Sequence, residues 1–146
     1  MKLHARIATM ALVAATAFAA VFASCGGREP ARQTGGAVFD ISGQLLEART
    51  DTLVDIGRLR SGEVIRYDAR LRNVGTEPLV VRNITTSCGC TSVEYTREPI
   101  APGASGEFSF SFDSRGMWGT QLKLIEIATS ASPLPYKVMV RAEVEE

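Results

Sequence analysis

The sequence has very little of the residue types that most catalytic and metal sites use. Its 146 residues include one histidine, His4, and three cysteines. His4 lies in an N-terminal segment that has the features of a removable export signal, so the processed chain would contain no histidine. A Ser-His-Asp triad, a Cys-His pair and an imidazole metal ligand within the chain are thereby excluded, because each needs an imidazole group. We therefore expect a non-enzymatic protein without a cofactor.

An excess of charge of one sign is also absent. The chain has 16 basic and 16 acidic side chains. Removal of residues 1–24 would take away Lys2 and Arg6, which leaves 14 basic against 16 acidic side chains and a net charge of −2. Such a surface provides no broad positive field for phosphate groups, so we expect no nucleic-acid partner.

Residues 1–24 have the three parts of a secretory signal peptide. A positive start is followed by an almost wholly apolar run, residues 7–22, and by small residues directly before Cys25. A cysteine at this place resembles the lipobox of bacterial lipoproteins, in which the thiol takes a diacylglyceryl group before the signal is cut. The alternative is an uncleaved membrane helix, but about 17 apolar residues is the lower end of the spanning range.

We therefore predict a signal peptide over residues 1–24 and lipid attachment, with acyl chains such as palmitate, at Cys25. Each buried methylene contributes roughly 0.8 kcal/mol, and more than one acyl chain is needed for stable attachment. Residues 25–37 include several glycines and show no apolar periodicity, which predicts a flexible tether. The expected location is the cell envelope, on the periplasmic face of a bacterial membrane or at the cell surface.

After the tether the chain lacks a convincing helical stripe, and only residues 45–49 fit one helical turn. Apolar and polar residues alternate instead, most clearly where Phe108, Phe110 and Phe112 share one face. The predicted strands lie at residues 53–56, 65–72, 78–86, 91–95, 107–113, 122–129 and 137–144. About seven short strands at this spacing predict an all-β protein, a single antiparallel β-sandwich over residues 38–146.

One predicted strand changes the parity of its apolar residues. Leu122 and Leu124 share one face, whereas Ile125 and Ile127 share the other. A β-bulge near Leu124 would bring all four to the same face, and a strand buried on both faces would also accommodate them.

Several short motifs occur in a fixed order along this region. They are Val54-Asp55-Ile56-Gly57, Leu71-Arg72-Asn73-Val74-Gly75 with Pro78-Leu79, Ser87-Cys88-Gly89-Cys90-Thr91, Pro99-Ile100-Ala101-Pro102-Gly103 and Phe112-Asp113. The ordered set resembles the bacterial domain-of-unknown-function family numbered 1573, over residues 53–144. The resemblance implies an immunoglobulin-like fold akin to the ASH and hydin-type domains, often carried on envelope lipoproteins. It implies no activity, because the family has none that is settled.

Cys88 and Cys90 are the only thiols left after lipid attachment, and three interpretations of the pair compete. The first is structural: a tight turn, with Gly89 at positive φ, whose cysteines are buried or bonded to each other. A bridge requires a folded turn, since an i,i+2 pair spans up to about 7 Å and bonded cysteines have Cα atoms about 4.4–6.8 Å apart. The second is a redox dithiol, which needs a lowered thiol pKa. The third is a Cu(I) site with thioether help from Met117 or Met139.

Arg66, Arg70 and Arg72 lie on one face of a predicted strand. Arginine pairs bidentately with carboxylate and phosphate, so this face is a candidate site for acidic glycans or lipid headgroups. The alternative is a solvated strand whose charges discourage edge-to-edge pairing. Trp118 is either an exposed binding aromatic or a plug at the end of the sandwich.

The sequence therefore predicts a non-enzymatic envelope lipoprotein that acts as a binding or scaffolding module. Its expected partners are the membrane, through the lipid, and a protein or glycan of the envelope. The alternative is a thiol redox or Cu(I)-handling protein that acts through Cys88 and Cys90.

Overall fold

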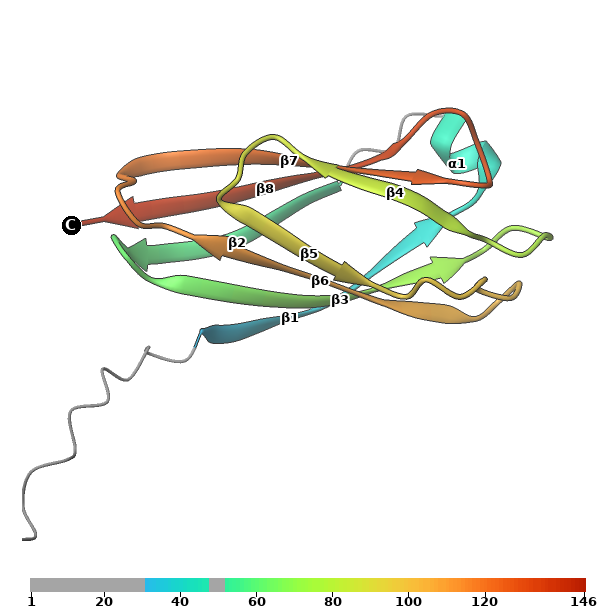
Figure 1. The fold of residues 1–146 in the computed structure, drawn as a ribbon, viewed down its shortest axis with the longest axis horizontal. Coiled ribbons are helices and arrows are strands. Elements are labelled where there is room, and N and C mark those ends of the chain that lie inside the picture. The colour runs from blue at the N-terminus through green and yellow to red at the C-terminus, as the bar shows by residue number, and fades with distance from the viewer. Residues whose placement is uncertain (1–30, 48–51) are drawn as a thin grey trace, which may run out of the picture.

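Two stacked β-sheets make up most of residues 31–47 and 52–146, the parts of the chain that a computed structural model describes (Figure 1). The elements are β1 (Arg32–Ile41), α1 (Gly43–Glu47), β2 (Thr52–Arg60), β3 (Val64–Asn73), β4 (Val81–Thr86), β5 (Thr91–Tyr95), β6 (Ser105–Asp113), β7 (Gly119–Thr129) and β8 (Tyr136–Glu145). The sheets have the strand orders β1-β3-β6-β5 and β2-β8-β7-β4. The predicted all-β sandwich is confirmed, with eight strands in these residues. The predicted signal peptide and Cys25 lie outside them.

Both sheets have a parallel pair at one edge. Strand β1 runs parallel to β3 and β2 runs parallel to β8, whereas the remaining neighbours are antiparallel. Strands β1 and β2 follow each other in the chain but lie in different sheets, so no hairpin turn forces antiparallel pairing at these edges. The antiparallel arrangement expected from the sequence therefore holds for all strands except these two.

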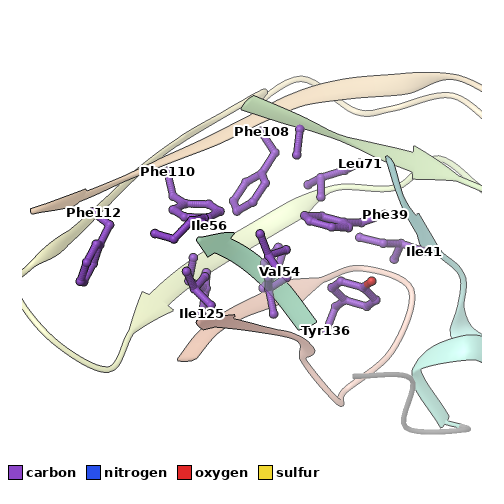
Figure 2. Close-up of a cluster of buried hydrophobic side chains, with 14 of the residues drawn as sticks. Phe39, Ile41, Val54, Ile56, Leu71, Phe108, Phe110, Phe112, Ile125 and Tyr136 are labelled. Atoms are coloured by element: carbon purple, nitrogen blue, oxygen red, sulfur yellow. The ribbon is translucent and has the colours of Figure 1, made fainter. Parts of the chain in front are cut away.

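The core between the sheets is built by the alternation that the sequence shows. Phe108, Phe110 and Phe112 of β6 are each 1% exposed and point between the sheets (Figure 2). Tyr67 of β3 stacks on Phe110 with ring centroids 5.2 Å apart. Ile125 of β7 is fully buried on the opposite side of the core. The predicted parity of β6 is thereby confirmed.

Strand β1 occupies residues that were expected to belong to the flexible tether, so that expectation is wrong in part. The tether was expected to extend through residue 37, but residues 32–41 form a strand with partners along β3. Phe39 of β1 is 2% exposed and lies between Phe108 and Tyr136, with ring centroids 5.9 Å from each. The run Gly35-Gly36 concealed the strand, because the register shifts between Gly35 and Ala37 and interrupts the alternation.

Strand β7 lacks the β-bulge that was expected near Leu124. Its pairing with β8 continues without a shift from Gly119 to Ile127, which excludes a bulge, and the exposure of Leu122 excludes burial on both faces. Leu122 is 57% exposed on the outer face of the sheet. Leu124 shares that face and pairs with Met139, which in turn pairs with Leu53. The parity changes because the outer face of this sheet itself carries apolar side chains.

Helix α1 is a single turn close to the one predicted at residues 45–49. The Ser42 hydroxyl accepts a hydrogen bond from the Leu45 amide at 3.3 Å, and Leu46 is 3% exposed. No helix of the described residues is long and apolar enough to cross a membrane.

Asn73 fixes the loops at the end of the sandwich where β3 ends. Its side chain is 2% exposed and donates hydrogen bonds to the carbonyl oxygens of Glu77 at 2.7 Å and Ile100 at 2.9 Å. The side-chain carbonyl oxygen of Asn73 accepts a hydrogen bond from the Gly75 amide at 2.9 Å. A buried amide with all these partners holds the β3–β4 loop against the β5–β6 loop.

Candidate functional site

The Cys88–Cys90 turn lies where the chain crosses from β4 in one sheet to β5 in the other. The two cysteines form a disulfide with Cα atoms 5.3 Å apart, inside the usual range for such bonds. Both residues are half-buried. Gly89 is exposed and is not at positive φ, so that part of the expectation is wrong. The pair is therefore bonded at a corner of the sandwich.

Backbone and hydroxyl groups hold this corner in place. The Asp113 amide donates to the Cys90 carbonyl at 3.0 Å, and the Thr86 hydroxyl donates to the Cys88 carbonyl at 3.0 Å. The Thr91 hydroxyl lies 3.7 Å from the sulfur of Cys88 and 3.9 Å from that of Cys90. The Asp113 contact binds the turn to the end of β6, and the threonine contacts bind it to β4 and β5, the strands that it joins.

Of the two thioether groups considered for a Cu(I) site, only that of Met117 shares surroundings with the cysteines, because Met117 and Cys90 both pack against the core. Met139 lies on the outer face of the second sheet, in register with Leu53 and Leu124, whereas Met117 packs against the core. Among residues 31–47 and 52–146, no three His, Cys, Asp or Glu side chains form a group suited to a metal ion.

Arg66 and Arg72, two of the three arginines singled out in the sequence, are held by carboxylates. Arg66 forms ion pairs with Asp68 and Glu94, each at 2.9 Å, and these partners, Glu94 first, raise its pKa above the usual value. Arg72 donates two hydrogen bonds of 2.7 Å to Asp40, which lower the pKa of Asp40.

Arg70 is the member of this face whose charge is available. It is exposed and lies opposite Glu107 in the register, and within the described residues its side chain makes no hydrogen bond or ion pair. The structure does bring Arg66, Arg70 and Arg72 to one face, but it leaves only Arg70 to receive an anion there. Arg58, Arg60 and Arg82 do not join them, because β2 and β4, which carry these three, belong to the second sheet.

A groove of about 890 Å³ crosses this face beside Arg70. Three basic and four acidic side chains line it: Arg66, Arg70, Arg97, Asp68, Glu94, Glu98 and Glu107. At its β5 side the Arg97 guanidinium lies 4.9 Å from the centroid of the Tyr95 ring, within cation–π range. The groove therefore offers charges of both signs and an aromatic edge, and not the purely basic face that the sequence suggested.

Tyr95, Arg97 and Glu107 were missed by the sequence analysis. Glu107 could have been found, because it alternates with the inward phenylalanines of β6 and must face outward. Arg97 and Tyr95 sit at the end of β5, where the strand gives way to a loop. No periodic pattern reaches across such a boundary, so their place in the groove follows only from the fold.

Trp118 does not plug the end of the sandwich. It lies in the turn between β6 and β7 and is 79% exposed. Of the two roles considered for it, only that of an exposed aromatic fits this position.

The family model for DUF1573, described as a protein of unknown function, matches residues 47–144. The chain belongs to the DUF1573 family. Cys88, Cys90, Asn73 and the groove-lining residues of β3, β5 and β6 all lie inside the matched range. The DUF1573 description names no enzymatic activity. No curated protein matches the chain.

Solved structures share the sandwich of this DUF1573 domain. A protein of unknown function from Porphyromonas gingivalis W83 is 28% identical with a TM-score of 0.57, over 64% of this chain and 44% of that one. The Vibrio cholerae VesB protease is 17% identical with a TM-score of 0.52, over 66% of this chain and 31% of the protease. The secreted serine protease VesC of that organism is 15% identical with a TM-score of 0.50, over 62% and 21%. This chain thus spans less than half of each, and the two proteases show the fold alone.

Proposed function

We propose that this protein is a lipid-anchored, non-enzymatic module of the bacterial cell envelope that binds a protein or glycan partner. The anchor is Cys25, preceded by a charged start, an apolar run and small residues. The module is the sandwich of a family whose description names no activity. The observation that supports partner binding is the groove on the β1-β3-β6-β5 sheet, a concave surface lined by basic and acidic side chains.

The groove suits recognition of a polar partner. Arg70 has free guanidinium donors for a carboxylate, and Glu98 and Glu107 can accept from hydroxyl, amide or amine groups. The stacked pair of Tyr95 and Arg97 adds an amphipathic contact of the kind that interfaces favour. Arg66, Asp68 and Glu94 are already held in shared ion pairs, so these side chains lose little conformational entropy when a partner binds.

Photocrosslinking in living cells tests whether a partner binds in the groove. A photoreactive amino acid replaces Glu98 in the groove, and in a matched control it replaces exposed Thr85 on β4 of the other sheet. We expect a discrete adduct in the membrane fraction from position 98, lost when Arg70→Glu is added, and no such adduct from position 85. Digestion of the adduct by protease or by a glycan hydrolase then tells a protein partner from a glycan. Equal adducts from both positions, or none from position 98, contradict the proposal.

A thiol redox role through Cys88 and Cys90 is the second candidate function. The observation that favours it is a bonded pair whose two residues are only half-buried, although Cys90 packs against the core. The contacts from Asp113 and Thr86 to the backbone of the turn favour the structural role instead.

A further inference from the structure

One end of the sandwich gathers the start of β1 with three other segments of the chain. Arg32 pairs with Ile65 at the start of β3, Arg60 at the end of β2 pairs with Glu145, and Gly119 at the start of β7 pairs with Val144. We call this the proximal end: Arg32, residues 58–64, residues 113–119 and Glu145. In Figure 1 it is the left side of the molecule, where the C-terminus is marked.

A buried hydroxyl holds the two turns of the proximal end together. Ser114 is fully buried, and its hydroxyl lies 2.9 Å from the carbonyl oxygen of Arg60 and 2.8 Å from that of Glu63. The Met117 amide donates to the Ser114 carbonyl at 3.0 Å. The β2–β3 turn, which carries Arg60, is thereby fixed against the β6–β7 turn, which carries Trp118.

The proximal end has a hollow of about 860 Å³ with guanidinium groups around it. Arg32, Arg58, Arg60 and Arg115 line it, together with Glu63 and Glu145. Arg32 contacts Glu63 at 3.3 Å, Arg58 contacts Glu145 at 3.4 Å, and Arg115 pairs with Asp113.

Free donors remain on these arginines. Arg60 is exposed and, among the described residues, its side chain has no hydrogen bond or ion pair. The side chains of Arg58 and Arg115 are 80% and 68% exposed, and each guanidinium has five N–H donors of which its carboxylate engages only some. Such planar donors match the geometry of carboxylate and phosphate, and phosphate is the oxyanion that a phospholipid surface presents.

The single tryptophan of the chain lies in the same β6–β7 turn as Arg115, at the proximal end. Trp118 is 79% exposed, although an indole in water forfeits much of its apolar burial. Tryptophan is enriched at the membrane–water interface, where its ring sits at headgroup level and its N–H remains hydrated. An exposed indole in the same turn as Arg115 gives the proximal end both an interfacial aromatic and basic side chains, as surfaces that contact membranes have.

The proposed lipid attachment at Cys25, on which the inference below rests, sets how far β1 can lie from the membrane. Only seven residue steps separate Cys25 from Arg32, so the start of β1 lies within about 25 Å of the lipidated residue whatever path the chain takes. A link of this length keeps the proximal end, where β1 starts, close to the bilayer.

We infer that the proximal end docks on the anionic phospholipid surface of the membrane that holds the lipid. Trp118 enters the headgroup layer, and Arg58, Arg60 and Arg115 contact lipid phosphates. The dock sets the sandwich upright on the membrane, so that the Asn73 end points away from it.

The fluorescence of Trp118 tests this dock directly, because no other tryptophan contributes. The lipidated full chain is inserted into vesicles that contain phosphatidylglycerol, with and without lipids brominated on the acyl chain near the headgroup. We expect brominated lipid to lower the emission of Trp118 about two-fold, since the indole lies at headgroup depth. Vesicles of phosphatidylcholine alone should quench it less.

Two sets of variants make the test specific. Arg58→Glu with Arg60→Glu should abolish most of the quenching, whereas Arg82→Glu on distant β4 should leave it unchanged. A reporter at the other end, Leu134→Trp combined with Trp118→Phe, should not be quenched. Circular dichroism of each variant checks that the sandwich is folded.

Flotation separates failure of the dock from failure of the anchor. Protein that floats with the vesicles while Trp118 is unquenched, or equally quenched in the Arg58→Glu, Arg60→Glu variant, overturns the dock and leaves the anchor standing. Protein that does not float at all, with no lipid on Cys25, overturns the anchor on which the dock rests.

Discussion

Neighbouring side chains along β6 lie in opposite surroundings, and this contrast decides how single substitutions act. Phe110 is 1% exposed and contacts Tyr67 and Phe108, whereas Ser111 faces outward and is half-buried. Ser109 is outward too, but it is only 6% exposed and accepts a hydrogen bond from Arg66 at 2.8 Å. Ser111 is therefore a better position than Ser109 for a control substitution to alanine.

We predict that Phe110→Ala lowers the free energy of unfolding by about 3–5 kcal/mol, the usual range for loss of a buried phenylalanine. Ser111→Ala should change it by less than about 0.5 kcal/mol, as at most surface positions. Urea denaturation of the two variants measures both values. Similar midpoints for the two would mean that the faces of β6 are wrongly assigned.

For Cys88 and Cys90 we predict a structural and not a chemical role. The ring closed by the bridge is short, so Cys88→Ser with Cys90→Ser should lower the stability by only about 1–2 kcal/mol on the chain-entropy estimate. Denaturation of the double variant gives this value. The wild type should exchange slowly with glutathione and should bind no Cu(I) in the presence of a strong chelator. One equivalent of Cu(I) held by the wild type and not by the double variant would establish the metal-handling alternative.

Strand β1 shows at the scale of elements how far the sequence could predict the fold. Alternation in β6 and β8 was sufficient, because their inward residues are apolar without interruption. Strand β1 begins with polar residues and two glycines, and only Phe39 and Ile41 are buried, so its pattern is that of a loop. In β7 the outer face is apolar as well, and alternation could not tell which face was the inner one. The groove could not be predicted either, because its side chains come from β1, β3, β5, β6 and the β5–β6 loop, which are brought together only in the folded state.

We predict that Gly35→Ala detaches the first part of β1. Gly35 has a φ of 141°, and a Cβ there would lie 2.0 Å from the carbonyl oxygen of Asp68, so backbone must move. Gly36 has a φ of 108° but open space around it, which makes Gly36→Ala a control with backbone strain alone. Hydrogen exchange should accelerate in residues 32–35 far more for Gly35→Ala than for the control. Equal exchange in both variants would contradict the close approach of β1 to β3.

The Asp40–Arg72 pair, which joins β1 to β3, should make stability depend on pH. Two hydrogen bonds from Arg72 lower the pKa of Asp40 in the folded state, so the stabilisation is present above the unfolded pKa of about 3.9 and is lost as pH falls through the folded value. We expect the urea midpoint to fall between about pH 5 and pH 2, less steeply in Asp40→Asn. The difference should be small and should shrink in about 1 M salt, because the pair is exposed. Parallel pH profiles for the two proteins would argue against the pair.

The whole molecule is organised along the long axis of the sandwich. Strand β1 starts at the proximal end, where Arg32, Arg60 and Trp118 lie, and Asn73 holds the loops at the opposite end. The groove lies between the two, on an outer sheet face. An anchor attached just before β1 would therefore hold the proximal end against the membrane and leave the groove open to a partner.

The most direct test of this account is the mass of the N-terminal residue of the protein extracted from the membranes of a native bacterial host. We predict that the mature chain begins at Cys25 and that this residue carries a diacylglyceryl group. A Cys25→Ser variant should carry no lipid and should leave the membrane fraction, while it keeps the denaturation midpoint of the sandwich. A chain that retains Met1, or a mature wild-type protein without lipid in the soluble fraction, would contradict the account.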